Sequence, residues 1–293
     1  MRQKKYRNSL IGKVEIMPFQ LLELRLTNTE YNQIFLTKEI LQNISKVIQL
    51  TQPHIAKIPL TRIGKNSDGG YIVGEVSQSK LCLNLGVGIE VSADLDLISQ
   101  NFKIHAFDGS VTNPLPNEPL FIFIQKNIGY SKDPGITTTL KEIFSDYPEL
   151  EHLDLLMLDI EGNEHQVLNE ELAFIIKAKQ IVVEFHGLEL LADGEYSNNL
   201  IKTLSKLSET HFPIHVHANN SGGTLPIGGA SWPTILEVTF LKKEFCTENL
   251  NYGPFPGPLD YPNVDLRPDI DLAPFYGLYK SYASLSRSIL AID

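Results

Sequence analysis

The sequence predicts an α/β protein in which helices cover both faces of a mostly parallel sheet. The middle of the chain alternates five short apolar runs with segments of helical spacing, a pattern typical of parallel strands buried on both faces. The final third replaces this alternation with two strands joined by a short loop rich in glycine and serine, so we expect these two strands to be antiparallel. The length of 293 residues and the apolar fraction of 42% are those of a globular protein with a large core.

The predicted elements fall into three regions. Residues 1–58 form a helical cap, with helical spacing over 19–50. The core, residues 59–250, opens on a turn-rich stretch and then holds the sheet. Its parallel strands are expected at 81–85, 103–108, 120–124, 153–159 and 180–184, its helices at 93–101, 139–146, 164–178 and 197–210, and its antiparallel pair at 214–218 and 234–241. Residues 251–293 form a proline-rich tail that packs on the core and ends in a short helix at 278–292.

Composition narrows the partners. Lys and Arg number 25 and Asp and Glu 35, which gives a net charge of −10, so we expect neither nucleic acid nor an anionic membrane surface as the main partner. No segment has the length and apolarity of a membrane span, and the N-terminus lacks the unbroken apolar stretch of a signal peptide. The two cysteines, Cys82 and Cys246, cannot make a disulfide framework. We therefore expect a cytoplasmic protein, and a homo-oligomer is left open.

A glycine turn follows the first strand of the sheet. Gly86 and Gly88 let the backbone turn tightly and approach a ligand at the start of the next helix. The third glycine of a dinucleotide-binding fingerprint is absent, because Val91 stands in its place. Asp108 ends the next strand, 20 residues after Gly88, which is the spacing at which an acid binds a ribose diol. The combination favours an adenosine-containing ligand over a tight turn with a capping acid.

Acidic residues also end the fourth and fifth strands, Asp159 on one and Glu184 on the other. The carboxyl ends of the strands form the functional crevice of an open α/β sheet, and neighbouring strands lie ~4.8 Å apart. The two carboxylates can therefore converge on one cation, of the kind that Mg²⁺, Ca²⁺ or Mn²⁺ represents. The alternative is structural, with Asp159 or Glu161 capping the following helix and Glu184 paired with a basic side chain.

Histidines near strand ends supply candidate bases and metal ligands. His186 lies two residues after Glu184, and strand alternation places His215, His217 and Asn219 on one face. A lone strand histidine is often structural, which is the alternative for each of them. His186 and His217 are the candidates for base or ligand, and the sequence does not choose between them.

Several of these stretches together resemble the FkbM-type S-adenosylmethionine-dependent methyltransferases. The most specific part is the Asp-x-Glu-Gly-x-Glu core within 155–168, followed by Val-Glu-Phe-His at 183–186. The likeness spans about residues 60–243. It also rests on 81–88, 107–109, 62–64, 68–71, 217–220 and 236–240.

The resemblance implies a Rossmann-like class I methyltransferase fold, a seven-stranded, mostly parallel sheet with an antiparallel C-terminal hairpin and helices on both faces. It implies S-adenosylmethionine as cofactor, bound by Arg62, Asp68, Tyr71, Gly86, Gly88, Asp108 and Gly109. It also implies Mg²⁺ or Mn²⁺ held by Asp159, Glu184 and His186, and catalytic roles for His186, His217 and Asp159. Leu158 stands where the family often has lysine, which leaves open whether that position contributes any charge.

The reaction that the resemblance implies is transfer of a methyl group to a hydroxyl of a sugar, nucleotide-sugar or glycan. A cation would lower the pKa of that hydroxyl, and a histidine would accept its proton. One alternative is an NAD-dependent oxidoreductase of a sugar, which shares the glycine turn and the ribose acid. The antiparallel pair and the absent third glycine argue against it. The other alternative is a catalytically silent cofactor-binding protein with the same fold.

Overall fold

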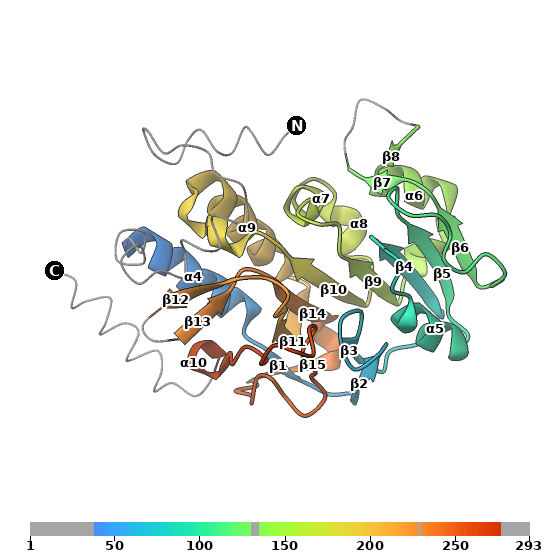
Figure 1. Ribbon diagram of the computed structural model, residues 1–293. Coiled ribbons are helices and arrows are strands. Elements are labelled where there is room, and N and C mark those ends of the chain that lie inside the picture. The colour runs from blue at the N-terminus through green and yellow to red at the C-terminus, as the bar shows by residue number, and fades with distance from the viewer. Residues whose placement is uncertain (1–37, 130–134, 228–229, 277–293) are drawn as a thin grey trace.

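A seven-stranded sheet forms the centre of the computed structural model, which describes residues 38–129, 135–227 and 230–276 (Figure 1). Its strand order is β11-β14-β10-β9-β4-β5-β6. All its strands run in one direction except β14, which is antiparallel to both of its neighbours. The strands are β4 (Leu81–Leu85), β5 (Lys103–Phe107), β6 (Phe121–Ile124), β9 (Leu155–Leu158), β10 (Gln180–Phe185), β11 (His211–Ala218) and β14 (Leu236–Lys242). The Rossmann-like, mostly parallel sheet with an antiparallel C-terminal hairpin is thus confirmed.

Helices cover both faces of the sheet because its strands are apolar on both. Alternate residues of β4 separate into two cores, with Leu83 and Leu85 in one and Cys82 in the other. The first core is closed by α4 (Lys38–Thr51), α6 (Leu140–Asp146), α7 (Glu164–Glu170), α8 (Leu172–Ile175) and α9 (Gly194–Leu207). The second is closed by α5 (Ser92–Ser99) and the hairpin of β2 (Leu60–Ile63) and β3 (Tyr71–Gly74), on the opposite side of the sheet in Figure 1.

Short elements complete the described chain. Three further pairs of strands lie outside the central sheet: β1 (His54–Ala56) with β15 (Cys246–Leu250), β7 (Asn127–Ile128) with β8 (Thr137–Thr138), and β12 (Thr224–Ile227) with β13 (Ala230–Pro233). The 3₁₀ helices are η1 (Pro148–His152), η2 (Leu188–Ala192) and η3 (Lys243–Phe245), and α10 (Ala273–Tyr276) is the last described element. Among all the residues that the structure describes, no helix has the length and apolarity needed to cross a membrane.

Two predicted elements differ from the structure, and two fall partly or wholly outside it. The helix expected over 164–178 is broken at Glu171, whose buried carboxylate accepts the amide of Leu140 at the start of α6. The turn-rich stretch at 61–73 contains the hairpin β2–β3. Helical spacing at 19–50 is observed from Lys38, and residues 19–37 and the helix expected at 278–292 lie outside the described residues.

The proline-rich tail contributes to the main core as far as it is described. Phe255 and Leu272 are buried in the core that α4 and α9 also close. Phe275 packs edge-on against Trp232 at 5.2 Å between ring centroids, and the Tyr276 hydroxyl lies 2.7 Å from Thr51 Oγ1 of α4. The tail therefore links the N-terminal helix to the β12–β13 hairpin.

Gly86→Ala should destabilise the fold much more than Gly88→Ala. Both glycines have positive φ, +88° and +62°, so each alanine carries about 1–2 kcal/mol of left-handed strain. A Cβ on Gly86 would lie 1.6 Å from the Asp159 carbonyl oxygen, whereas one on Gly88 would meet nothing within 4 Å. Overpacking at Gly86 adds roughly 1–3 kcal/mol. Urea unfolding of both variants measures the difference, and equal losses of stability would contradict this close approach.

Candidate functional site

A cavity of about 830 Å³ opens where four strands of the sheet end. Gly86, Asp108, Asp159 and Glu184, one from each of β4, β5, β9 and β10 or the residue after it, all line its wall. Its lining is strongly acidic and includes the carboxylates Asp68, Glu90, Asp94, Asp108, Asp159, Glu161 and Glu184. The residues that the sequence placed at strand ends therefore meet at one rim of the sheet.

Asp108 organises the glycine turn. Its Oδ2 accepts the amide of Gly88 at 2.8 Å, and its Oδ1 accepts the amide and hydroxyl of Ser110 at 2.7 and 2.6 Å. Burial opposes ionisation of Asp108, but these hydrogen bonds outweigh it and lower the pKa of the carboxyl. Gly109 packs closely here too, since a Cβ on it would lie 2.5 Å from the Asn127 side chain. The turn thus carries a fixed negative charge at the cavity wall.

The inner wall of the cavity holds a polar pair that the sequence analysis did not identify. Asn84 on β4 donates from Nδ2 to Asp94 Oδ1 on α5 at 2.9 Å. Asp94 is 1% exposed, and its Oδ2 has no hydrogen-bond partner. Burial, opposed by the Asn84 hydrogen bond, raises the pKa of Asp94 to about 6. The one available indication in the sequence is Asn84 itself, a polar residue inside an apolar strand.

The three residues expected at the cofactor-side wall have different positions. Asp68 and Tyr71 line the cavity. Arg62 instead supports the 64–70 loop, donating from Nε to the Lys65 carbonyl and from Nη2 to the Ser67 carbonyl, each at 2.9 Å. Its guanidinium also lies 5.2 Å from the ring centroid of Tyr261 in the tail. Arg62 therefore fixes the loop that carries Asp68.

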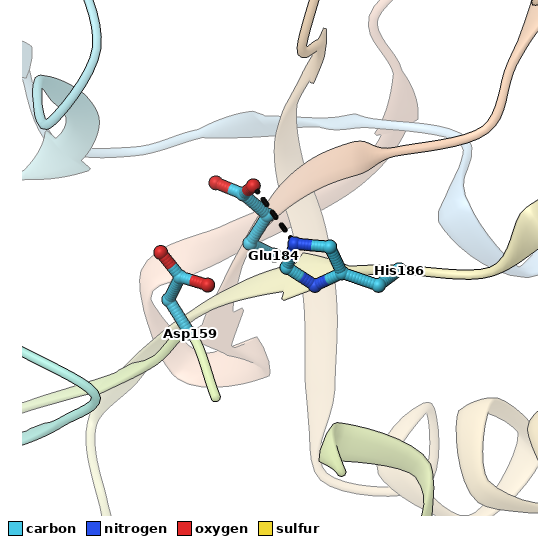
Figure 2. Close-up of side chains that lie close together, drawn as sticks. All are labelled: Asp159, Glu184 and His186. Atoms are coloured by element: carbon cyan, nitrogen blue, oxygen red, sulfur yellow. Dashed lines mark ion pairs between the residues drawn. The ribbon is translucent and has the colours of Figure 1, made fainter. Parts of the chain in front are cut away.

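Asp159, Glu184 and His186 come together beside the cavity (Figure 2). Each offers a ligand atom within 4.8 Å of the other two, and His186 Nε2 lies 3.3 Å from Glu184 Oε1. Asp159 Oδ1 is buried and has no hydrogen-bond partner. Burial, and then the charge of Glu184, raises the pKa of Asp159 well above its usual value, while burial raises the pKa of Glu184 to about 7. These two carboxylates are poised for a positively charged neighbour.

Glu164 fixes the ring of His186. The Glu164 side chain is fully buried, and its Oε1 lies 3.1 Å from His186 Nδ1. The same carboxylate accepts the amides of Ile160 and Gly162 at 3.0 Å, and the Tyr196 hydroxyl donates to the His186 carbonyl at 2.8 Å. Burial would lower the pKa of His186, but Glu164 and Glu184 outweigh it and raise that pKa to about 11. Nδ1 is therefore directed to Glu164, and Nε2 to Glu184.

His217 lies in a separate cluster with the tail. Its Nδ1 is 3.1 Å from Glu237 Oε2 on β14, and its Nε2 is 3.2 Å from Asp269 Oδ1 in the tail. Burial would lower its pKa, but Glu237 and Asp269 outweigh it and raise that pKa to about 10. His215 pairs with Asp260 of the tail at 2.9 Å, whereas Asn219 donates to Glu184 Oε1 at 3.1 Å. From the face that these three residues share, Asn219 is the one that contacts Glu184.

Comparison with known proteins gives the family. The model of the methyltransferase FkbM domain matches residues 39–209, more than half of the chain. The chain belongs to the FkbM methyltransferase family. Its match covers the glycine turn, Asp108, Asp159, Glu184 and His186, and it ends before the strand that carries His217.

Two solved structures are similar to this chain at low identity. One is a fibrillarin/Nop5p complex, with 13% identity, a TM-score of 0.37, and coverage of 57% of this chain and 74% of that chain. The other is the 1,6-didemethyltoxoflavin-N1-methyltransferase of Burkholderia thailandensis, with bound 1,6-didemethyltoxoflavin and S-adenosylhomocysteine. It shows 11% identity and a TM-score of 0.30, over 79% of this chain and 93% of that one. No curated protein matches the sequence.

His217→Gln should remove a pH-dependent part of the stability. Because the folded-state pKa of His217 is raised from 6.5 to about 10, its protonated form stabilises the fold fully below pH 6.5, and this contribution is lost as the pH rises through 10. The free energy of unfolding should therefore exceed that of the variant most at about pH 6, with a gap that closes towards about pH 10. Urea unfolding across this range measures it. Substitution of the exposed His152 by Gln is the control, and a gap independent of pH would contradict the ion pairs.

Proposed function

We propose that this chain is an S-adenosylmethionine-dependent O-methyltransferase that acts on a hydroxyl of a sugar, nucleotide-sugar or glycan with the help of a divalent cation. The observation that carries the proposal is that the glycine turn, Asp108, Asp159 and Glu184 line one cavity in a chain of the FkbM family. The acceptor class comes from the resemblance of the sequence to the family. The acidic lining of the cavity supports the cofactor and the divalent cation.

The charge of the cavity suits this cofactor. S-Adenosylmethionine, when bound, supplies a methyl group on a positively charged sulfur. Asp94 presents a buried oxygen without a partner, and Asp108 presents an ionised carboxylate beside the glycine turn. Among the described residues that line the cavity there is no lysine, arginine or histidine. A cation is therefore favoured in this space.

The same features disfavour the oxidoreductase alternative. A dinucleotide places its pyrophosphate on the amides of the glycine turn at the start of a helix. Here the Gly88 amide already donates to Asp108. A pyrophosphate would thus meet an ionised carboxylate where it needs a donor.

The residues present fit a divalent cation. Two carboxylates and one imidazole are a donor set that Mg²⁺ or Mn²⁺ accepts, and the partnerless Asp159 Oδ1 is an orphaned buried acceptor. A cation held by Asp159, Glu184 and His186 would lower the pKa of an acceptor hydroxyl. Glu164 supports this role, because it binds His186 Nδ1 and leaves Nε2 directed to the other two ligands.

Asp159 is the group we assign to the proton of the acceptor hydroxyl. Its side chain lines the cavity, and burial raises its pKa, which favours uptake of a proton. A carboxylate has two oxygens, so one can accept this proton while the other ligates the cation. His186 lies between Glu164 and Glu184, so we assign it to orientation of the site and to ligation of the cation, for which its Nε2 has to lose its proton. His217 is held between Glu237 and Asp269, so we assign it to anchoring the tail. We place the protein in the cytoplasm, since Cys82 and Cys246 are both buried free thiols.

Cofactor binding and methyl transfer test the proposal directly. The protein should bind S-adenosylhomocysteine by calorimetry and transfer a labelled methyl group to a member of a sugar and glycan panel. Asp108→Asn should weaken that binding roughly tenfold or more, the weight of a hydrogen bond to a charged group, and the exposed Asp146→Asn should not. Binding of NADH in place of S-adenosylhomocysteine would favour the oxidoreductase. Cofactor binding without transfer to any acceptor would favour the silent protein.

Asp159→Asn and Glu184→Gln should each weaken Mn²⁺ binding by at least about tenfold, because each removes a charged ligand. Titration of Mn²⁺ followed by electron paramagnetic resonance measures this, with the exposed Glu170→Gln as the matched control. S-Adenosylhomocysteine binding should persist in both variants. Methyl transfer that survives excess chelator would show that no divalent cation is needed, while the proposed S-adenosylmethionine dependence would stand.

A further inference from the structure

The cavity is equipped to exclude anions as well as to hold a cation. Its carboxylates include two with buried oxygens that have no partner, Asp94 Oδ2 and Asp159 Oδ1. A phosphate or carboxylate on the acceptor would also approach the ionised carboxylate of Asp108, which lines the same cavity and has the same sign of charge. The described residues that line the cavity offer no basic side chain to compensate it.

The backbone amides at the strand ends are already occupied by the protein's own carboxylates. Asp108 accepts the amides of Gly88 and Ser110 after β4 and β5. Glu164 accepts the amides of Ile160 and Gly162 after β9. Amides in such turns are where proteins commonly bind phosphate. Both of these potential anion sites are therefore filled from within.

Three basic groups that contact residues of the cavity wall or its loop are engaged as well. Lys65 forms an ion pair with Glu90 at the cavity wall, and His186 lies between Glu164 and Glu184. The Arg62 guanidinium donates to backbone carbonyls of the 64–70 loop. Each of these three already contacts a carboxylate or a backbone carbonyl, which offsets the positive charge that it could offer to a phosphate.

Glu161 adds an exposed negative charge at the cavity wall. Its side chain is 87% exposed, and its Oε2 lies 3.6 Å from His186 Nε2. Its backbone is held at φ +54°, the left-handed region, in the turn whose Gly162 amide binds Glu164. The fold thus keeps a carboxylate beside the proposed cation site at a cost in backbone strain.

We propose that the acceptor is electrically neutral around its reacting hydroxyl, a free or glycosidic polyol and not a nucleotide-sugar, and that Glu161 contributes to this selection. The inference rests on the proposed function and narrows its acceptor class. A bound divalent cation and a cofactor of net charge +1 still leave the seven lining carboxylates in excess. The repulsion therefore persists in the loaded site.

Two measurements test the inference. Uridine diphosphate and inorganic pyrophosphate are titrated calorimetrically into the protein, both free and loaded with S-adenosylhomocysteine, with and without Mn²⁺. We expect no saturable binding up to about 1 mM beyond that seen when the same diphosphate is titrated into Mn²⁺ without protein. Neutral methyl hexosides are then compared as methyl acceptors with their uronate, hexose 1-phosphate and uridine-diphosphate counterparts. We expect the neutral member of each set to have a kcat/KM at least about tenfold higher.

Glu161→Lys should reduce the ratio of kcat/KM for the neutral acceptor to kcat/KM for its anionic counterpart. Glu161→Gln should reduce this ratio less, and the exposed Glu248→Gln on β15 should leave it unchanged. Diphosphate binding tighter than about 100 µM, or faster methylation of a nucleotide-sugar than of the neutral hexoside, would overturn the inference while the proposed methyltransferase stands. If no acceptor in the panel is methylated, the diphosphate titration still decides. Failure to bind S-adenosylhomocysteine would instead count against the proposed function.

Discussion

Buried negative charge at the carboxyl edge of the sheet is the constraint on which the rest of this structure depends. Glu184 and Glu237 stand directly opposite each other on β10 and β14, and both are buried. Like charges in this position repel, so each needs a nearby donor or cation. His186 and Asn219 contact the carboxylate of Glu184, while His217 and Asn263 contact that of Glu237. The polar groups at this edge therefore form one connected set of contacts. In this set, an amide donor and an imidazole offset the charge of each buried glutamate.

The tail belongs to this arrangement and does more than cover the core. Asn263 donates from Nδ2 both to Glu237 and to Asp68, which lines the cavity. Asp269 and Asp260 bind His217 and His215 on the strand next to β14. A contact path thus runs from the proline-rich tail through Asn263 to Asp68 and the loop that carries it. Loosening of the tail would remove donors from Glu237 and support from Asp68 together.

The sequence predicted the sheet and the residues at its rim because both follow from local pattern. Apolar runs that end in glycine or acid place four residues at one edge of a parallel sheet: Gly86, Asp108, Asp159 and Glu184. This placement follows from the direction of the strands and does not depend on the orientation of each side chain. The partners of buried polar groups were beyond reach, since they come from distant parts of the chain. Strand alternation put His217 on a face but could not show that Asp269, 52 residues later, would meet it. Glu164 is the last acid of the core motif, but its contacts and those of Asp94 were likewise hidden, because a helical acid is usually a solvated one.

The geometry of the site and its preference for positive charge have one cause. Asp108 and Glu164 shape the turns after β4 and β9 by accepting their amides, and this is also what removes those amides as anion sites. A turn held by a ligand would be formed only when the ligand is bound, whereas a turn held by an internal carboxylate is formed beforehand. The preorganisation that we propose for a cationic cofactor and the exclusion that we propose for anionic compounds therefore depend on the same hydrogen bonds. If the acceptor is the neutral hydroxyl that we propose, these turns need no change of backbone conformation to receive it beside a positively charged methyl donor.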